Sequence, residues 1–361
     1  MKTAVVMGPG SIFCSTQPNS IETVARTLSR YSANRDQVTV YCDAGAVDRG
    51  DLRTVAVAPG LGRTGRIIRA LRRDPPQFLE LHQHGPSAAA IARAFPHIPS
   101  VLYRHNQASG GRGPLARMRY EHRFRAFDGH VFVSDYLRGA FADCFPALAA
   151  RGFTVHNPID ADLWAAPVEG RGPVIAYTGR AVPEKGFDLI CAALEPVLER
   201  HPDWRADLLV IDWHTHADWA QAQIDRLARF GDRVSLRKQQ PWAAVRNTLQ
   251  GAAIALVPSA FPDPFPLAAL EAHAAGAAVI SSGRGGLREG SGPHALYVEP
   301  LDAPTLADRI EQLIADPELR LAMARSGQQH VQTEHTPQRR AAQLDALRAR
   351  LVEARKTRAR T

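Results

Sequence analysis

The feature that most constrains this chain is an alternation of short apolar runs with longer amphipathic segments, repeated in two series. Short apolar runs favour buried strands, and amphipathic stretches favour helices. Strands that alternate with helices are joined by right-handed crossovers and form parallel sheets. The strands expected in the first series are Thr3–Met7, Gln37–Tyr41, Thr54–Ala58, Phe78–Leu81, Ser100–Arg104, Gly129–Val133 and Phe153–His156.

A second series follows a cluster of proline and glycine residues between 167 and 173, which we interpret as a linker. The sequence therefore predicts two doubly wound α/β domains facing a cleft, residues 1–166 and 167–336, followed by a basic helix or tail, residues 337–361. Ligands of such sheets bind at the carboxyl ends of the strands. The strands expected in the second series are Val174–Thr178, Asp207–Ile211, Arg233–Leu236, Ile254–Val257, Ala278–Ser281 and Ala295–Val298.

The composition is that of an ordinary globular chain, with 45% apolar and 22% charged residues, and it excludes disordered and fibrous proteins. Lysine and arginine number 44 against 36 acidic residues, a net charge of +8. Such a charge favours polyanions, anionic membrane surfaces or phosphorylated substrates. The four cysteines are too scattered to predict a disulfide framework or a zinc ribbon.

No stretch reaches the roughly 18 apolar residues of a membrane-spanning helix, and the N-terminal apolar run is too short for a signal peptide. We therefore expect a cytoplasmic protein, at most peripheral on the inner face of the cell membrane. Residues 63–73 fit such attachment, because on a helix their arginines interleave with Ile67, Ile68 and Leu71. The alternative is that these apolar residues pack on the sheet of the first domain.

A proline-rich loop follows the fourth strand of the second series and leads into a helix expected to begin near Pro266. Proline suits the first helical position, where its missing N–H has no intrahelical partner to lose. The free N–H groups of Leu267 and Ala268 would lie at the positive end of the helix dipole, which favours a phosphate. Asp263 before the helix and Glu271 within it could bind the hydroxyls of a sugar and a ribose.

A second loop, from Thr178-Gly179-Arg180 to Lys185-Gly186, follows the first strand of the same series and precedes a helix. Arg180 and Lys185 can converge on one anion, the arginine as a planar fork and the lysine as a point charge. The same spacing also fits an ordinary loop between a strand and a helix.

Together these segments resemble the retaining glycosyltransferases of family 4, which have the two-domain GT-B fold. Asp263-x7-Glu271 is similar to the family's E-x7-E motif, and the loop with Arg180 and Lys185 resembles its diphosphate loop. The resemblance covers most of the chain and implies a C-terminal helix that crosses back to the N-terminal domain. Further matches, in the family's order, are Val133–Leu137, Val155–Asp160 and Gly285–Glu289.

The resemblance implies a role for each matching residue. Arg180 and Lys185 would bind the donor diphosphate and stabilise its charge as the sugar departs. Glu271 would bind the ribose hydroxyls, and Asp263 would contact the transferred sugar. His105, which follows a strand of the first domain, matches the family's active-site histidine.

The amides of Leu267 and Ala268 would contact the donor phosphates. Asn19 and Ser20 stand where many members have two glycines before the first helix, and they are included in the expected donor site because asparagine tolerates positive φ. The first acid of the E-x7-E motif is here Asp263, one methylene shorter than the usual glutamate.

The resemblance implies a retaining, metal-independent hexosyltransferase without a further cofactor, using a nucleotide-diphosphate sugar such as a UDP- or GDP-sugar. The expected acceptor is a glycan or lipid-linked molecule in bacterial surface polysaccharide or lipopolysaccharide synthesis, and no nucleic-acid partner is expected. The alternatives are a basic nucleic-acid-binding protein and a GT-B scaffold that has lost transfer. A sugar-nucleotide epimerase or a phosphorylase would need acid–base carboxylates or a cofactor-binding lysine that cannot be placed.

Two short segments hold residues of metal-binding type. Asp212-Trp213-His214-Thr215-His216 offers a carboxylate and two imidazoles, but we expect it to shape the donor pocket. Asp160-Ala161-Asp162 resembles the DxD motif of the other glycosyltransferase fold, but we expect it to form a turn between the domains.

Overall fold

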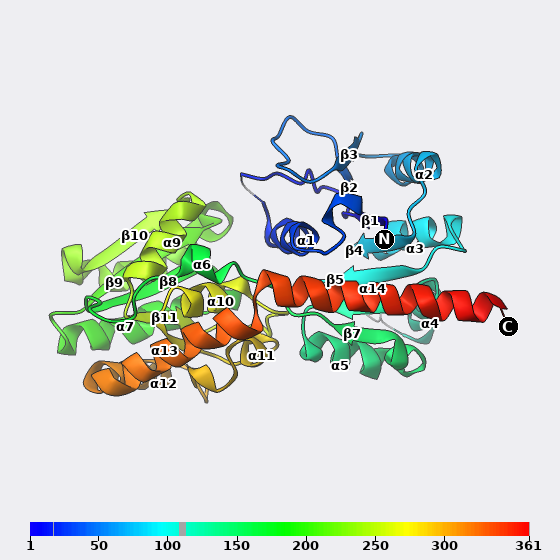
Figure 1. The fold of residues 1–361 in the computed structure, drawn as a ribbon. Coiled ribbons are helices and arrows are strands. Elements are labelled where there is room, and N and C mark those ends of the chain that lie inside the picture. The colour runs from blue at the N-terminus through cyan, green and yellow to red at the C-terminus, as the bar shows by residue number, and fades with distance from the viewer. Residues whose placement is uncertain (17, 108–112, 361) are drawn as a thin grey trace. The chain divides into compact units, whose positions relative to one another are not determined.

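The computed structural model describes residues 1–16, 18–107 and 113–360. It divides into two compact units: unit 1 is Met1–Pro158 with Pro337–Thr361, and unit 2 is Ile159–Thr336 (Figure 1). The units divide a short way before the boundary expected at residue 166. The reason is that residues 159–166 pack within unit 2, where the N–H of Ile159 donates to the carbonyl of His335 at 2.8 Å and Trp164 is buried.

Unit 1 contains a seven-stranded sheet in the order β3-β2-β1-β4-β5-β6-β7, with every pairing parallel. Each strand lies where the sequence predicts one. The runs are short and apolar because a parallel sheet is covered on both faces. The bounds are β1 (Thr3–Val6), β2 (Val38–Asp43), β3 (Thr54–Val57), β4 (Phe78–His82), β5 (Ser100–Arg104), β6 (Gly129–Phe132) and β7 (Gly152–Thr154).

Helices flank this sheet (Figure 1). Several begin at a side-chain cap; for example, Ser134 Oγ accepts from the N–H of Leu137 at 3.2 Å. The bounds are α1 (Ser20–Arg30), α2 (Arg63–Arg73), α3 (Gly85–Ala94), α4 (Pro114–Phe124), α5 (Asp135–Cys144) and α14 (Pro337–Arg360), with short 3₁₀ segments η1 (Arg35–Gln37) and η2 (Pro146–Arg151).

The C-terminal helix α14, red in Figure 1, belongs to unit 1, which confirms the predicted return to the N-terminal domain. It packs beside α1, and the Asp345 carboxylate accepts from Ser32 Oγ at 2.9 Å. Its arginines are partly structural rather than solvated: Arg348 is 1% exposed, and the guanidinium of Arg350 stacks over the Phe153 ring at 4.7 Å.

Unit 2 contains a six-stranded sheet in the order β10-β9-β8-β11-β12-β13, again parallel throughout. Its core is built from strand residues such as Ile175, Leu208 and Ile254, which are fully buried. The strands are β8 (Val174–Arg180), β9 (Arg205–Ile211), β10 (Val234–Lys238), β11 (Ile254–Val257), β12 (Ala278–Ser281) and β13 (Ala295–Tyr297). The helices are α6 (Ala161–Trp164), α7 (Phe187–Arg200), α8 (Ala217–Ile224), α9 (Trp242–Gly251), α10 (Leu267–Ala274), α11 (Leu287–Ser291), α12 (Ala303–Ala315) and α13 (Pro317–Glu334), with η3 (Pro183–Lys185), η4 (Trp213–His216), η5 (Asp225–Arg233) and η6 (Gly292–His294).

Helix α2 distinguishes the two alternatives that the sequence leaves open for residues 63–73. Ile67 and Leu71 are fully buried and Ile68 is half-buried, so these apolar residues pack within unit 1 rather than being available to a bilayer. Arg63 is buried too, paired with Asp43, and its Nη2 donates to the carbonyl of Met7 at 2.9 Å. In the described part of the chain, no helix is long and apolar enough to cross a membrane.

Arg63 is expected to contribute much more to stability than the exposed arginines of α2. Changing Arg63→Met leaves the Asp43 carboxylate buried without its cation, which costs roughly 3–5 kcal/mol and lowers the melting temperature by roughly 10 °C. Arg69→Met is the matched control on the exposed face and should change stability by less than about 0.5 kcal/mol. Thermal unfolding followed by circular dichroism measures both; equal melting temperatures for the two variants would contradict the buried pair.

Candidate active site

The candidate site lies at the carboxyl edge of the unit 2 sheet, where strands distant in the sequence are neighbours. β8 pairs with β11, with Ile175 opposite Ile254. After β8 the chain builds outward through β9 and β10 and then returns to β11, so the direction of winding reverses between β8 and β11. Ligands of doubly wound sheets bind at such a reversal. The two loops singled out in the sequence both leave the sheet at this point.

The loop after β8 is supported by Tyr177, which is buried. Its hydroxyl donates to the carbonyl of Arg180 at 2.7 Å. Burial and the neighbouring Asp263 raise the pKa of this phenol, so it remains a neutral donor. The guanidinium of Arg180 is exposed and forms no hydrogen bond or ion pair with any described residue. The predicted convergence of Arg180 and Lys185 on one anion remains a prediction.

The loops of the site pack backbone against backbone. Gly186 has a φ of +70°, and a Cβ there would lie 2.3 Å from the carbonyl oxygen of Pro258. Gly285 has a φ of +63°, and a Cβ there would lie 2.3 Å from the carbonyl oxygen of Asp263. Only glycine fits at either position. These contacts hold the loops after β8, β11 and β12 together.

This packing brings Lys185 to Asp263, 78 residues further along the chain. Nζ of Lys185 lies 2.6 Å from Oδ1 of Asp263. Asp263 is 7% exposed, and its second oxygen, Oδ2, is buried without a hydrogen-bond partner among the described residues. The shorter acid is therefore positioned by a lysine, and one of its oxygens can still accept a hydrogen bond.

Helix α10 begins directly after this loop. Pro266 is its N-cap residue and not its first helical residue as predicted, because its ψ of 132° is extended. No side chain caps the helix, and its first turn holds no acid. The N–H groups of Leu267 and Ala268 are therefore among those left without intrahelical acceptors, as the sequence predicts for an anion-binding helix end.

Glu271 follows on the same helix. It is half-buried, and its carboxylate forms no hydrogen bond or ion pair with any described residue. Burial raises its pKa from 4.5 to about 7. A carboxylate held in this way can accept hydrogen bonds from two hydroxyl groups.

His105 lies in unit 1, just after β5, and is 7% exposed. Its ring Nε2 lies 3.0 Å from Nδ1 of His82, which stands at the end of β4. The backbone N–H of His105 donates to Gln83 Oε1 at 3.0 Å. Burial, with the nearby His82, lowers the pKa of His105 well below its usual value, so the ring is neutral. The carboxyl ends of two adjacent strands thus present His82 and His105 together.

Asn19 and Ser20 also lie in unit 1, at the start of α1. Asparagine tolerates a positive φ, but Asn19 has a φ of −73°, so its backbone is not left-handed. Its Oδ1 instead caps the helix by accepting from the N–H of Glu22 at 2.9 Å. Ser20 is the first residue of α1 and is exposed. A donor contact by either residue remains a prediction.

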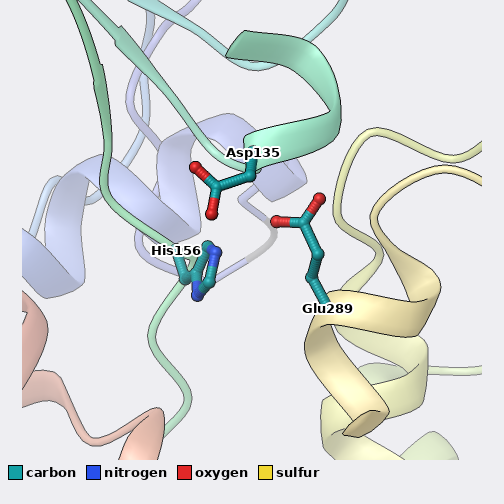
Figure 2. A group of neighbouring side chains, drawn as sticks. All are labelled: Asp135, His156 and Glu289. Atoms are coloured by element: carbon teal, nitrogen blue, oxygen red, sulfur yellow. The ribbon is translucent and has the colours of Figure 1, made fainter. Parts of the chain in front are cut away.

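We assign no metal site to the segment 212–216 or to the group formed by Asp135, His156 and Glu289. The Asp212 carboxylate accepts from Thr215 Oγ1 at 2.5 Å within its own turn. Figure 2 shows Asp135 and His156, which are neighbours in unit 1, and Glu289, which lies on α11 of unit 2. Because this group is divided between the two units, we assign no metal site to it.

Three residues near the candidate site residues were missed by the sequence argument: Tyr177, Glu80 and Arg348. Only Glu80 left a signal, because a carboxylate in the middle of the buried strand Phe78–His82 requires a partner. That partner, Arg348, could not be identified from the sequence because it lies on α14, 268 residues away.

Comparison with known proteins agrees with this architecture. Residues 21–163 match the family model described as Glycosyltransferase Family 4, and residues 159–330 match that described as Glycosyl transferases group 1. A glycogen synthase of Mycobacterium tuberculosis is 28% identical over 300 residues, which cover 78% of this chain and 71% of the relative. A phosphatidyl-myo-inositol mannosyltransferase of the same species is 29% identical over 264 residues, which cover 67% of this chain and 66% of that relative.

The crystal structure of Anabaena Alr3699/HepE in complex with UDP superposes with a TM-score of 0.80 at 17% identity, over 96% of this chain and 99% of that one. Both units and their parallel sheets are thus those of the GT-B fold. The two family models overlap at residues 159–163 and together span residues 21–330 without a gap. The chain is a glycosyltransferase of the GT-B fold, a member of the family 4 and group 1 glycosyltransferases.

Proposed function

We propose that this enzyme is a retaining, metal-independent hexosyltransferase that moves a sugar from a nucleotide-diphosphate sugar to a glycan or lipid-linked acceptor. The observation that carries the proposal is the arrangement at the reversal point of unit 2. There the Lys185–Asp263 pair, the uncapped start of α10 and the carboxylate of Glu271 share one sheet edge. A diphosphate, a ribose and a sugar require these three kinds of partner.

Each part of the donor meets a matching group. The diphosphate lies at the N–H groups of Leu267 and Ala268, where the helix dipole favours negative charge. Arg180, which has no partner in its own unit, and Lys185 supply the cations. Glu271 accepts from the ribose hydroxyls, and the Asp263 carboxylate contacts the transferred sugar. Asn19 and Ser20 are placed near the donor only by the family pattern.

Transfer needs no side chain as nucleophile. The bond from the anomeric carbon to the leaving phosphate oxygen breaks, and its electron pair stays on the phosphate. The acceptor oxygen bonds to the same face of that carbon, and its proton passes to the leaving phosphate. Arg180 and Lys185 stabilise the charge that develops on the diphosphate. His105 orients a hydroxyl of one substrate.

The donor and acceptor classes are supported by similar proteins. HepE is described in complex with UDP and with UDP-glucose, which favours a UDP-sugar over a GDP-sugar. One similar protein is named a glycogen synthase and another a phosphatidyl-myo-inositol mannosyltransferase; these names indicate a glycan and a lipid, respectively, and support the two acceptor classes proposed here. We place the reaction at the cytoplasmic face of a bacterial membrane, in surface polysaccharide or lipopolysaccharide synthesis. The exposed arginines of α2, Arg69, Arg72 and Arg73, would then contact anionic headgroups.

A thermal-shift screen against UDP-, GDP-, ADP- and dTDP-sugars tests the donor class. A ligand at about 100 times its dissociation constant stabilises the folded protein by roughly 2.7 kcal/mol. We expect a UDP-sugar to raise the melting temperature and free glucose, the control, to leave it unchanged. The proposal fails if none of the four nucleotide sugars shifts the melting temperature while duplex DNA does, which would favour the nucleic-acid-binding alternative.

Removing either cation of the donor site should slow transfer. Arg180→Ala and Lys185→Ala are each expected to lower turnover by roughly 10²–10³-fold, the usual cost of losing one charge-stabilising contact. Arg180→Ala should leave stability unchanged because the side chain is exposed. Arg226→Ala, an exposed arginine of η5, is the control and should keep full activity.

Lys185→Ala also leaves the buried Asp263 without its cation, so stability must be separated from catalysis. The double variant Lys185→Met/Asp263→Asn removes both charges and should recover the lost stability but not the lost turnover. Steady-state rates with the donor identified by the screen give the answer. Wild-type turnover in either single variant would remove that residue from the mechanism.

The ionised carboxylate of Glu271 is expected to lower the stability of the ligand-free protein above about pH 7. Because its folded pKa of about 7 lies above the ordinary 4.5, its contribution to stability is full below pH 4.5 and is lost as the pH rises to about 7. Glu271→Gln should therefore raise the free energy of unfolding at pH 8 by roughly 3 kcal/mol, and with it the melting temperature, with a smaller effect at pH 5.

The same variant should weaken binding of the nucleoside diphosphate, measured by calorimetry, because the ribose hydroxyls lose a charged acceptor worth about 1.5–3 kcal/mol per bond. Asp263→Asn is the contrast: it should affect the nucleotide sugar more than the free nucleotide. A Glu271→Gln protein that binds the nucleotide as tightly as wild type would show that this carboxylate faces no ribose.

A further inference from the structure

A row of buried polar side chains in unit 1 runs from the C-terminal helix to His105. Arg348 on α14 donates to Glu80 Oε2 from Nε at 3.1 Å and from Nη2 at 2.7 Å. The other oxygen of Glu80 lies 2.9 Å from Nε2 of His82, and Nδ1 of His82 lies 3.0 Å from Nε2 of His105. Each group in the row thus touches the next at hydrogen-bond distance.

The row is shielded from water and its rings are held in place. Glu80 and Arg348 are each 1% exposed and His82 is 2% exposed. The Tyr103 ring stacks on His82 at 5.0 Å and on His105 at 4.8 Å, with the planes nearly parallel. The stacking therefore keeps both imidazole rings from tilting out of their planes.

The charges in the row decide where its protons lie. Burial alone would raise the pKa of Glu80, but Arg348 and His82 outweigh it and lower that pKa to about 2. An ionised carboxylate can only accept, so Nε2 of His82 must carry a proton. The tautomer of His82 that carries this proton and no other accepts at Nδ1. Nε2 of His105 must therefore carry the proton that it donates to His82, and Nδ1 of His105 keeps its lone pair.

We propose that Glu80 and His82, supported by Arg348, are positioning residues that fix the tautomer of His105 and present its Nδ1 as a hydrogen-bond acceptor. The inference rests on the proposed function, in which His105 orients a substrate hydroxyl. A hydroxyl that donates to Nδ1 is then held in one orientation. Helix α14 thereby takes part in the active site through Arg348, which contacts no substrate itself.

A second buried ion pair in the same unit, Arg63–Asp43, provides a control that distinguishes positioning of His105 from simple stabilisation of the fold. Arg63 and Asp43 are nearly as deeply buried as Arg348 and Glu80, at 4% and 2% exposure. Among the described residues, neither of them forms a hydrogen bond with a histidine. If buried charge served only stability, loss of either carboxylate would have the same consequences. If the row positions His105, only Glu80 controls that ring.

The test replaces Glu80→Gln, with Asp43→Asn as the matched control. In Glu80→Gln the amide oxygen accepts from Arg348, so the amide N–H₂ faces His82 and donates to its Nε2. His82 must then carry its proton on Nδ1 and donate to His105, whose own proton moves to Nδ1. Nitrogen-15 NMR of the histidine-labelled full chain at pH 8, above the ordinary pKa of histidine near 6.5, reports which ring nitrogen is protonated.

We expect wild type and Asp43→Asn to carry the His105 proton on Nε2, and Glu80→Gln to carry it on Nδ1. With the donor found in the screen, Glu80→Gln should lose about 10²-fold in turnover, as when a group that orients the substrate is misplaced, while donor affinity changes less than threefold. The same His105 tautomer in folded Glu80→Gln as in wild type overturns the inference. Absence of nucleotide-sugar binding in wild type would overturn the proposed function instead, and the NMR result would not depend on it.

Discussion

The strand order of the unit 2 sheet is the constraint on which the candidate site depends. Because β8 lies between β9 and β11, the chain must build one half of the sheet and then return, which places two separate loops at one carboxyl edge. The backbone contacts of Gly186 with Pro258 and of Gly285 with Asp263 leave no room for side chains, so the loops interlock. The ion pair between Lys185 and Asp263 follows from this packing.

Each unit contains a glutamate whose carboxylate is costly to bury, but only one of the two carboxylates has a charged partner among the described residues. In unit 1 the carboxylate of Glu80 is fully paired, which lowers its pKa and makes it a fixed acceptor. In unit 2 the carboxylate of Glu271 has no charged partner among the described residues to offset its burial, and burial raises its pKa to about 7 at a cost in stability. Paired buried charge serves to orient a neighbour, whereas unpaired charge is typical of a site built to bind a ligand.

The sequence predicted the strands because residues in parallel sheets, such as Ile254–Val257, are buried on both faces and form continuous apolar runs. It predicted the site loops through their resemblance to a family. It could not predict partners: Lys185 and Asp263 meet through tertiary packing, and Arg348 reaches Glu80 from the other end of the chain. For residues 63–73, periodicity left insertion and core packing equally open, and only the fold shows that Leu71 is in the core.

The proposed function requires that a nucleoside diphosphate bind at the carboxyl edge of β8 and β11. A crystal structure of the enzyme with UDP would locate this ligand. We expect a phosphate within hydrogen-bond distance of Lys185 Nζ and of the first amides of α10, with the ribose hydroxyls on the Glu271 carboxylate. UDP bound elsewhere on the protein, or bound here with Glu271 and Lys185 both turned away from it, would exclude this donor site.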